Sequence, residues 1–565
     1  MKRLEWIAAV VVVGALALAG CGASSAAAPV EPSTVTVALP AQSAPGWWYP
    51  IWSSTDCGGT LFNNAYNDLF WVNPNDSINY SESIARSVTV SHNDTVYTIH
   101  LNPRWHWSDG RPVTAADVLF QWQVILASNQ ANAPWHSCEN GIGGVPSKFK
   151  SVVMAGPYTV VVTTTAPVNP EWFIGNGLSQ LTPVPVTVWD KYPHNMAKEL
   201  AYIKQVATNP LNPVFRVVDG PYVLVRAVSD QYWEYEWNPR YSGTPKPRVR
   251  YIYYAYETST AGEFAQLKKG SVQVGYISGS LLTAAKSLHD YVIRPEYGSF
   301  GFNYVVPNLA STAPGIGGLF QHLYIRQALQ YGINQLAIVK DFYHGAAVAT
   351  LGPVPRAPAN VYYNTHLTNP YPFDPAQGLK LLEEHGWRLT NGVMTRNGKA
   401  LAFTFIYASG SNTQTHIAEL LQHDWGLEGI RVSLKTEPFN QVVSYGPSTA
   451  DQWDMISWGG GWGYSPALFP SGGGLFKCGG GANFGSYCNT AMNRVVNATY
   501  APGTDAQITS RLDAYQVFAA QTLPVLYVPE AASYLAVAGD LHGYFGTFNP
   551  FQVQDGQPNG WYYGP

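Results

Sequence analysis

The sequence predicts an α/β protein with mixed sheets, divided into more than one domain. Segments with the apolar–polar alternation of strands follow segments that carry helix-start and helix-stop signals. The clearest unit is a strand at 401–409, a helix at 415–429 and a strand at 430–436, which together predict a β-α-β unit. The chain has 565 residues, which is too long for one compact core. We therefore expect two or three domains, whose segments can be interleaved along the chain.

Local patterns justify the elements of the first half of the chain. The segments 34–40 and 95–101 alternate as strands. Thr114 and Asp117 form a variant capping box, because the hydroxyl and the carboxylate can satisfy free backbone donors where a helix begins. That helix carries its apolar residues toward a core. Farther along, 219–227 and 232–243 predict two antiparallel strands that end at a Pro/Gly turn.

The second half shows stronger helix signals. A helix at 259–270 ends at a glycine and is followed by a strand at 272–277. The segment 324–345 predicts one long amphipathic helical region. Asp374 is the expected N-cap of the next helix, which Gly386 ends.

The composition narrows the class of protein. Charged residues make up 12% of the chain and the net charge is −4, which argues against a nucleic-acid partner, since that needs clustered Lys and Arg. Aromatic residues reach 14%, so the 53 glycines and 41 prolines belong to a folded, loop-rich chain and not to a disordered one.

The N-terminus resembles that of a bacterial lipoprotein. Lys2 and Arg3 precede an apolar run of about 15 residues, which is short for a membrane span and suits a signal peptide. The run ends in Leu-Ala-Gly-Cys, similar to a lipobox, so we expect residues 1–20 to be removed and Cys21 to be lipidated. Residues 21–33 then form a flexible tether to the outer side of the cell membrane. The alternatives are a secretory signal with a chance cysteine, or an uncleaved anchor.

Four further cysteines suggest two disulfides in an exported chain. Cys478 and Cys488 are close in sequence, so we expect a disulfide between them, which leaves Cys57 to pair with Cys138. A metal site is the alternative. It is disfavoured because the chain has no CxxC and its histidines do not cluster near these positions, so we expect no metal.

Five blocks of the chain stand out when they are taken together and in order. They are WSDGRPVTAADVLFQW (107–122), DGPYVLV with NPRYSG (219–225 and 238–243), IRQALQYGINQLAIV (325–339), FDPAQGLKLLEEHGW (373–387) and LPVLYVPEAASYLAV (523–537). With these collinear blocks the chain resembles the family 5 extracellular solute-binding proteins, the peptide- and nickel-binding lipoproteins of ABC importers. Caps and turns explain most residues of the blocks, and Asn334 replaces the family's usual Asp in the third.

The resemblance implies a two-lobed, periplasmic-binding-protein-like α/β fold of type II, in its large cluster C form, with a cleft between the lobes. Lobe I would take 34–295 plus 524–565, with an inserted subdomain at about 80–205, and lobe II would take 298–522. The chain would cross between the lobes around Asn303 and again at 523–530. A hinge motion would then enclose the ligand.

The loop WGGGWGYSP, residues 458–466, lies where dipeptide-binding relatives carry an aspartate that pairs with the peptide's ammonium group. That place falls on Gly461, and no acidic residue occurs between Asp454 and Asp505. The segment 407–416, where those relatives place an arginine for the peptide carboxylate, has no Arg or Lys. Because an unpaired buried charge is costly, both absences favour a ligand without closely held terminal charges at these positions. A longer peptide held through its backbone fits, as does a neutral compound such as an oligosaccharide.

The candidate ligand-binding residues are therefore aromatic or uncharged. Aromatic rings can stack on a ligand, and glycines let its backbone approach closely, although core packing is the alternative for each aromatic residue. The candidates are Trp458, Gly460, Gly461, Trp462 and Tyr464 of the loop, Asn303 and Asn412 as polar contacts, and Trp47 and Trp48 of lobe I, expected to face the loop.

The predicted function is a lipid-anchored receptor that captures an oligopeptide or other solute and delivers it to an ABC permease. The chain has none of the GxSxG, HExxH or P-loop motifs, so we expect no enzyme, no cofactor and no nucleotide site; the partner ATPases would supply the energy. We expect a monomer. The alternatives are a sensor or receptor lipoprotein of the same fold and a carbohydrate-binding importer component; a glycosidase would need two cleft carboxylates.

Overall fold

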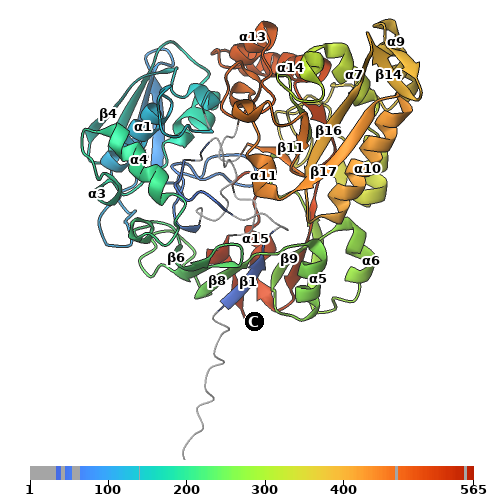
Figure 1. Cartoon of the computed structure of the whole chain (residues 1–565). Helices are drawn as coiled ribbons and strands as arrows, with labels where there is room; N and C mark the ends of the chain where they lie inside the picture. The colour runs from blue at the N-terminus through green and yellow to red at the C-terminus, as the bar shows by residue number, and fades with distance from the viewer. Residues whose placement is uncertain are drawn as a thin grey trace, which may run out of the picture.

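The computed structural model describes residues 34–39, 45–51, 53, 64–138, 140–464, 469–552 and 557–564. Figure 1 shows α1, α4 and β4 on one side, α10, β16 and β17 on the other, and β1, β6 and β8 beneath both. Each of these groups is built on its own sheet, and the three sheets position everything described below.

The lowest sheet has seven strands in the order β10-β22-β9-β1-β8-β7-β6. β1 lies parallel to β8 and β9, and it buries Val35 and Val37, as its alternation predicts. β22 comes from near the end of the chain and pairs antiparallel with both β10 and β9. The bounds are β1 Thr34–Ala38, β6 Tyr222–Val228, β7 Tyr232–Trp237, β8 Tyr251–Ala255, β9 Val274–Ile277, β10 Tyr291–Glu296 and β22 Ser533–Ala538. The predicted antiparallel pairing of β6 with β7 is confirmed.

A second, four-stranded antiparallel sheet has the order β2-β3-β5-β4 and carries α1, against which α4 packs. The predicted capping box is present at the start of α1: the Asp117 carboxylate accepts a hydrogen bond of 2.7 Å from the backbone N–H of Thr114. The bounds are β2 Ala85–Ser91, β3 Val96–Leu101, β4 Phe149–Gly156, β5 Thr159–Thr164, α1 Ala115–Ser128 and α4 Met196–Val206.

The third sheet has the order β17-β16-β18-β11-β19, with β20 also paired to β11. The predicted β-α-β unit is confirmed, since β16 and β17 are parallel neighbours joined by α10. The bounds are β11 Gly301–Pro307, β16 Ala402–Ala408, α10 Asn412–Leu427, β17 Arg431–Glu437, β18 Met455–Ser457, β19 Gly461–Gly463 and β20 Leu526–Tyr527.

The helical region predicted at 324–345 is interrupted, so its prediction as one region is wrong. α7 (Leu323–Tyr331) ends before Gly332, and the side chain of Asn334 accepts from the Ala337 N–H at 3.0 Å to begin the short α8 (Gln335–Ala337). A Cβ at position 332 would lie 2.5 Å from the Trp425 ring, so tight packing against α10 requires glycine there. By contrast, Asp374 caps α9 (Pro375–Glu384) as predicted.

Two segments connect the lowest sheet with the third. The chain passes directly from β10 to β11, and it returns through β20, β21 (Glu530–Ala531) and β22. β21 pairs with β12 (Ala347–Val348). Leu526 and Tyr527 of the returning segment still pair with β11. The lobe boundaries stay predictions.

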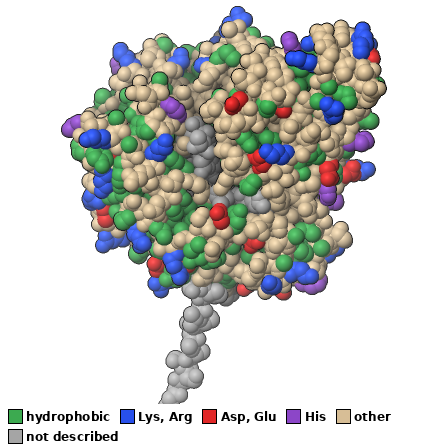
Figure 2. Space-filling model, viewed as in Figure 1, with side chains coloured by type: hydrophobic (Ala, Val, Ile, Leu, Met, Phe, Trp, Pro, Cys, Tyr) green, Lys and Arg blue, Asp and Glu red, His purple; other side chains and the backbone are tan. Residues whose placement is uncertain are grey.

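The Cys478–Cys488 disulfide is confirmed, with an S–S distance of 2.07 Å. Cys138 is also disulfide-bonded, while Cys57, its predicted partner, lies outside the described residues, as does Cys21. Within the described ranges, no helix combines the length and apolar character needed to cross a membrane, and no three potential metal ligands gather. Figure 2 shows basic and acidic side chains scattered over the visible face.

Candidate ligand-binding site

The loop after β18 is held against β11 by backbone pairing. Gly459 has a φ of +82°, which turns the chain so that β19 runs antiparallel to β11 with Gly461 opposite Asn303. A Cβ on Gly461 would lie 1.8 Å from the carbonyl oxygen of Phe302. The glycine at 461 is therefore required by contact between two strands, and an aspartate would not fit this backbone arrangement.

The three aromatic residues of the loop differ in exposure. Trp458 is half-buried and meets Tyr304 edge-on, with ring centroids 5.4 Å apart. Trp462 is also half-buried and packs against the core. Tyr464 is 1% exposed, and its hydroxyl donates to the carbonyl of Pro353 at 2.6 Å. Trp458 and Trp462 thus keep surface for a ligand, whereas Tyr464 packs.

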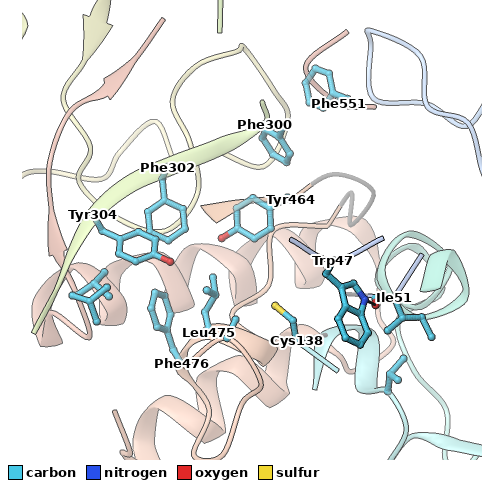
Figure 3. Close-up of a cluster of buried hydrophobic side chains, with 14 of the residues drawn as sticks. Trp47, Ile51, Cys138, Phe300, Phe302, Tyr304, Tyr464, Leu475, Phe476 and Phe551 are labelled. Atoms are coloured by element: carbon cyan, nitrogen blue, oxygen red, sulfur yellow. Dashed lines mark hydrogen bonds between the residues drawn. The ribbon is translucent and has the colours of Figure 1, made fainter. Parts of the chain in front are cut away.

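Figure 3 shows Tyr464 inside an aromatic cluster beside β11. Its ring centroid lies 5.6 Å from that of Phe300 and 6.2 Å from that of Phe302. Phe551, from the C-terminal segment, packs on Phe300 at 5.0 Å. This cluster joins the C-terminal segment to the third sheet and supports the strand on which the loop rests.

A small cavity opens next to the loop, between β11, β16, α10 and the segment 528–529. Its volume is about 20 Å³, room for about one water molecule. Asn303 and Gly460, both predicted, line it. Gln414 on its wall donates to the Tyr343 hydroxyl at 3.3 Å, and the Asn303 side chain donates to the Pro529 carbonyl at 3.2 Å. The cavity is lined mostly by apolar groups, with a few polar ones.

Three predicted residues lie elsewhere. Asn412 is exposed at the first position of α10, a helix capped by Ser411. Trp47 is 6% exposed and donates its indole N–H to the Ile51 carbonyl at 2.7 Å. Trp48 is 4% exposed, with its ring 6.4 Å from that of Trp233. Because both side chains are buried and have aromatic or backbone partners nearby, the two tryptophans have the packing role that was the alternative to ligand binding.

Sequence reasoning missed several polar groups around the cavity. Gln414 belongs to the segment 407–416, in which the sequence analysis names Asn412 as the polar candidate. Tyr343 and Ser457 carry no sequence signal, since their place depends on the packing of α10 and β18 against β11. Glu530, beside the lining residue Pro529, was read as part of a crossing segment only.

A set of contacts, here called the lobe contact, joins residues 171–176, which follow β5, to Tyr362, Phe469 and Tyr500. Asn176 exchanges two hydrogen bonds with the backbone of Phe469, at 2.6 and 2.9 Å. Trp172 stacks on Tyr500 with ring centroids 4.0 Å apart. The Tyr362 hydroxyl donates to the Glu171 carboxylate at 2.7 Å. The structure is thus closed over the aromatic cluster.

Asp76 lies at the edge of the lobe contact. Its burial, and then the negative charge of Glu171, raise the pKa of the Asp76 carboxyl to about 7. The charged form of Asp76 is therefore disfavoured while the lobe contact is closed.

Comparison with known proteins identifies the family. Residues 79–481 match the model of the bacterial extracellular solute-binding proteins, family 5 (middle region). The chain belongs to this family. The predicted family is therefore confirmed.

Relatives by sequence are distant. The family-5 chain is 23% identical over 480 residues to the dipeptide-binding protein of Escherichia coli, covering 82% of this chain and 83% of that one. It is 26% identical over 383 residues to proteins of Brucella ovis and Brucella abortus. That match covers 66% of this chain, which spans about 64% of the length of those curated relatives.

Solved structures show the same fold. The oligopeptide-binding protein AppA of Bacillus subtilis, in complex with a nonapeptide, superposes with a TM-score of 0.79 at 19% identity, covering 95% of this chain and 99% of that one. NikZ of Campylobacter jejuni, in complex with Ni(L-His), gives 0.75 at 19% identity, covering 94% and 100%. The predicted two-lobed α/β fold is confirmed.

Proposed function

We propose that this chain is the extracytoplasmic receptor of an ABC importer, and that it captures an oligopeptide between its two lobes and passes it to the permease. The observation that carries the proposal is the family match over 79–481, in a fold similar to that of a nonapeptide complex. The chain binds and does not catalyse. Lipidated Cys21 and the tether 21–33 would hold it at the membrane.

Ligand entry requires the lobes to part. The cavity beside β11 holds about one water molecule, far too little for a peptide. Two crossing segments, β10 to β11 and β20 to β22, link the sheets and are suited to act as a hinge. Opening would break the lobe contact and expose the half-buried faces of Trp458 and Trp462.

Native mass spectrometry of the purified protein tests the ligand class. We expect the protein to retain oligopeptides, or to bind them from a mixed peptide pool added after mild unfolding and refolding. Retention of sugars, with no peptide bound from the pool, would contradict the peptide proposal.

Replacing Trp458 and Trp462 together by Ala is expected to weaken oligopeptide binding by about tenfold or more, because stacked aromatic rings contribute a large share of binding energy. Isothermal titration calorimetry measures the affinity. Trp237, a tryptophan of β7 that is 38% exposed, is the control: its replacement by Ala should leave the affinity unchanged. A large fall in melting temperature with unchanged affinity would instead show that the two loop tryptophans serve packing.

Oligopeptide affinity is expected to increase about tenfold from pH 8 to pH 6. Asp76 has an ordinary pKa of 3.8 and a pKa of about 7 in the closed structure, so closing takes up a proton in this range and is favoured as the pH falls below 7. Asp76→Asn should remove this part of the pH dependence, as titration calorimetry at both pH values can show. An equal pH dependence in wild type and Asp76→Asn would refute the role of Asp76.

A further inference from the structure

Glu530 is a buried carboxylate at the junction between the two lobes. It lies in β21, between β20, which pairs with the third sheet, and β22, which pairs with the lowest sheet. Its side chain is 6% exposed. Any opening of the lobes about the crossing segments therefore moves the structure around this residue.

The carboxylate lacks a partner for one of its oxygens. Oε2 is inaccessible and makes no hydrogen bond with the described residues, and none of the ion pairs between described residues involves Glu530. The backbone N–H of Asn303 is the hydrogen-bonding group that favours its charged form, while burial raises the pKa of Glu530 well above its ordinary value. Burying a carboxylate in this way is costly unless a positive charge joins it.

The surroundings of Glu530 are those of the candidate site. Asn303 lines the cavity and stands opposite Gly461 in the strand pairing. Val528 and Pro529, directly before Glu530, line the same cavity. The charge of Glu530 adds to burial in raising the pKa of Tyr343, another lining residue, to about 12. Three elements thus place lining residues around one unpaired carboxylate.

We propose that Glu530 pairs with a primary ammonium group of the captured ligand. This inference rests on the proposed function and defines its substrate class: the oligopeptide presents either its N-terminal ammonium or a lysine side chain at the junction of the lobes. The loop 458–466 lacks a negative charge, and Glu530 of the crossing segment supplies one, 69 residues after Gly461 in sequence. Asn303 connects the two places, because it pairs with Gly461 in the sheet and its backbone N–H favours the charged form of Glu530.

The pairing explains why a carboxylate is kept at a place where it costs stability. When the lobes close on a captured ligand, its ammonium would take the free Oε2, and the low local dielectric would strengthen the attraction. Without ligand, opening lets water reach the carboxylate. The charge would therefore oppose closing of the empty protein and favour closing of the loaded one.

Binding of three oligopeptide pools tests the inference: one with free N-termini and no Lys, one N-acetylated without Lys, and one N-acetylated with a single Lys. Wild-type protein is expected to bind the first or third pool at least about thirtyfold more tightly than the second. Whichever pool binds identifies the source of the ammonium. Glu530→Gln should bind all three alike, and Glu530→Met is a second variant that fills a similar volume.

Glu428→Gln is the matched control, because Glu428 is fully buried and neither of its side-chain oxygens has a hydrogen-bond partner among the described residues. Unlike Glu530, which adjoins lining residues of the cavity, Glu428 packs against Gly332 and Gly378, which do not line it. It should discriminate between the pools as wild type does. Equal binding of all pools by wild type, or discrimination kept by Glu530→Gln, would overturn the inference while leaving peptide binding intact.

Failure of the proposed function gives a different result, since wild type then binds none of the pools. In that case thermal-shift measurements with small primary amines and with neutral sugars test the role of Glu530 separately from the proposed function. Stabilisation by an amine that is lost in Glu530→Gln supports it. Stabilisation by sugars, or no response to any amine, refutes it.

Discussion

Replacing Arg326 by Ala is expected to lower the free energy of unfolding by about 3 kcal/mol or more. Arg326 lies in α7 and is 4% exposed. Its guanidinium donates four hydrogen bonds to backbone carbonyls, among them those of Thr522 at 2.9 Å and Leu523 at 2.7 Å. Those two carbonyls end α14 (Asp505–Thr522), where a cation also offsets the helix dipole.

No single neutral side chain can replace this arrangement. Burial lowers the pKa of Arg326 to about 10, so the group stays charged at neutral pH. The planar fork reaches several carbonyls at once, which a lysine ammonium on its flexible stem cannot match. Arg326→Lys is therefore expected to destabilise as well, though less than Arg326→Ala.

Urea unfolding followed by tryptophan fluorescence measures both variants. Arg388 provides the control, because it too donates to two backbone carbonyls at a helix end, those of Glu383 and Trp387, but it is exposed. Arg388→Ala should change the free energy of unfolding by about 0.5 kcal/mol or less. A similar small change in Arg326→Ala would show that the buried carbonyls find other partners.

Replacing Asp454 by Ala is expected to cost about 3 kcal/mol of stability and to weaken ligand binding too. Asp454 is 2% exposed. Its Oδ1 accepts from the N–H groups of Gly315 and Ile316 at 2.7 and 3.1 Å, and its Oδ2 accepts from the Thr404 N–H at 3.0 Å. Hydrogen bonds to a charged carboxylate are stronger than neutral ones, and all three donors would be left without this acceptor.

The effect on binding follows from position. Asp454 immediately precedes β18, which leads into the loop at Trp458, and it fixes that strand to β16 through Thr404. Asp451, an exposed residue on the same approach, is the control, and Asp451→Ala should alter neither stability nor affinity. Calorimetric unfolding and oligopeptide titration of both variants check this. If Asp454→Ala loses stability but binds oligopeptide with full affinity, then ligand binding by the loop does not depend on Asp454.

Local signals made most of the fold predictable. The capping box at Thr114 and the N-cap at Asp374 act within one helical turn, so the sequence contains all the interacting groups. The break after Tyr331 was missed, although Gly332 and the Asn334 cap lie in the sequence. The lack of room for a side chain at 332 could not be predicted, because the Trp425 ring is distant in sequence and reaches the glycine only in the packed structure. Period and caps do not report such contacts.

The site was less predictable for the same reason. The loop and Asn303 were found because they carry unusual composition or lie in a family block. Composition could not separate Trp458 from Trp47, since both are tryptophans in Gly-rich or Pro-rich surroundings and only packing makes one half-buried and the other 6% exposed. Glu530 was hidden because its neighbour Asn303 lies 227 positions earlier.

The strand order of the lowest sheet also bears on how the chain is made. β1 is the first described strand, yet its neighbours β8 and β9 begin at Tyr251 and Val274, and the sheet is complete only when β22 has appeared. A polypeptide that emerges N-terminus first must therefore keep β1 unpaired until nearly half of the chain has been made, and β9 and β10 must wait for β22 until almost all of it has. Such late pairing slows folding and leaves strand edges exposed to aggregation.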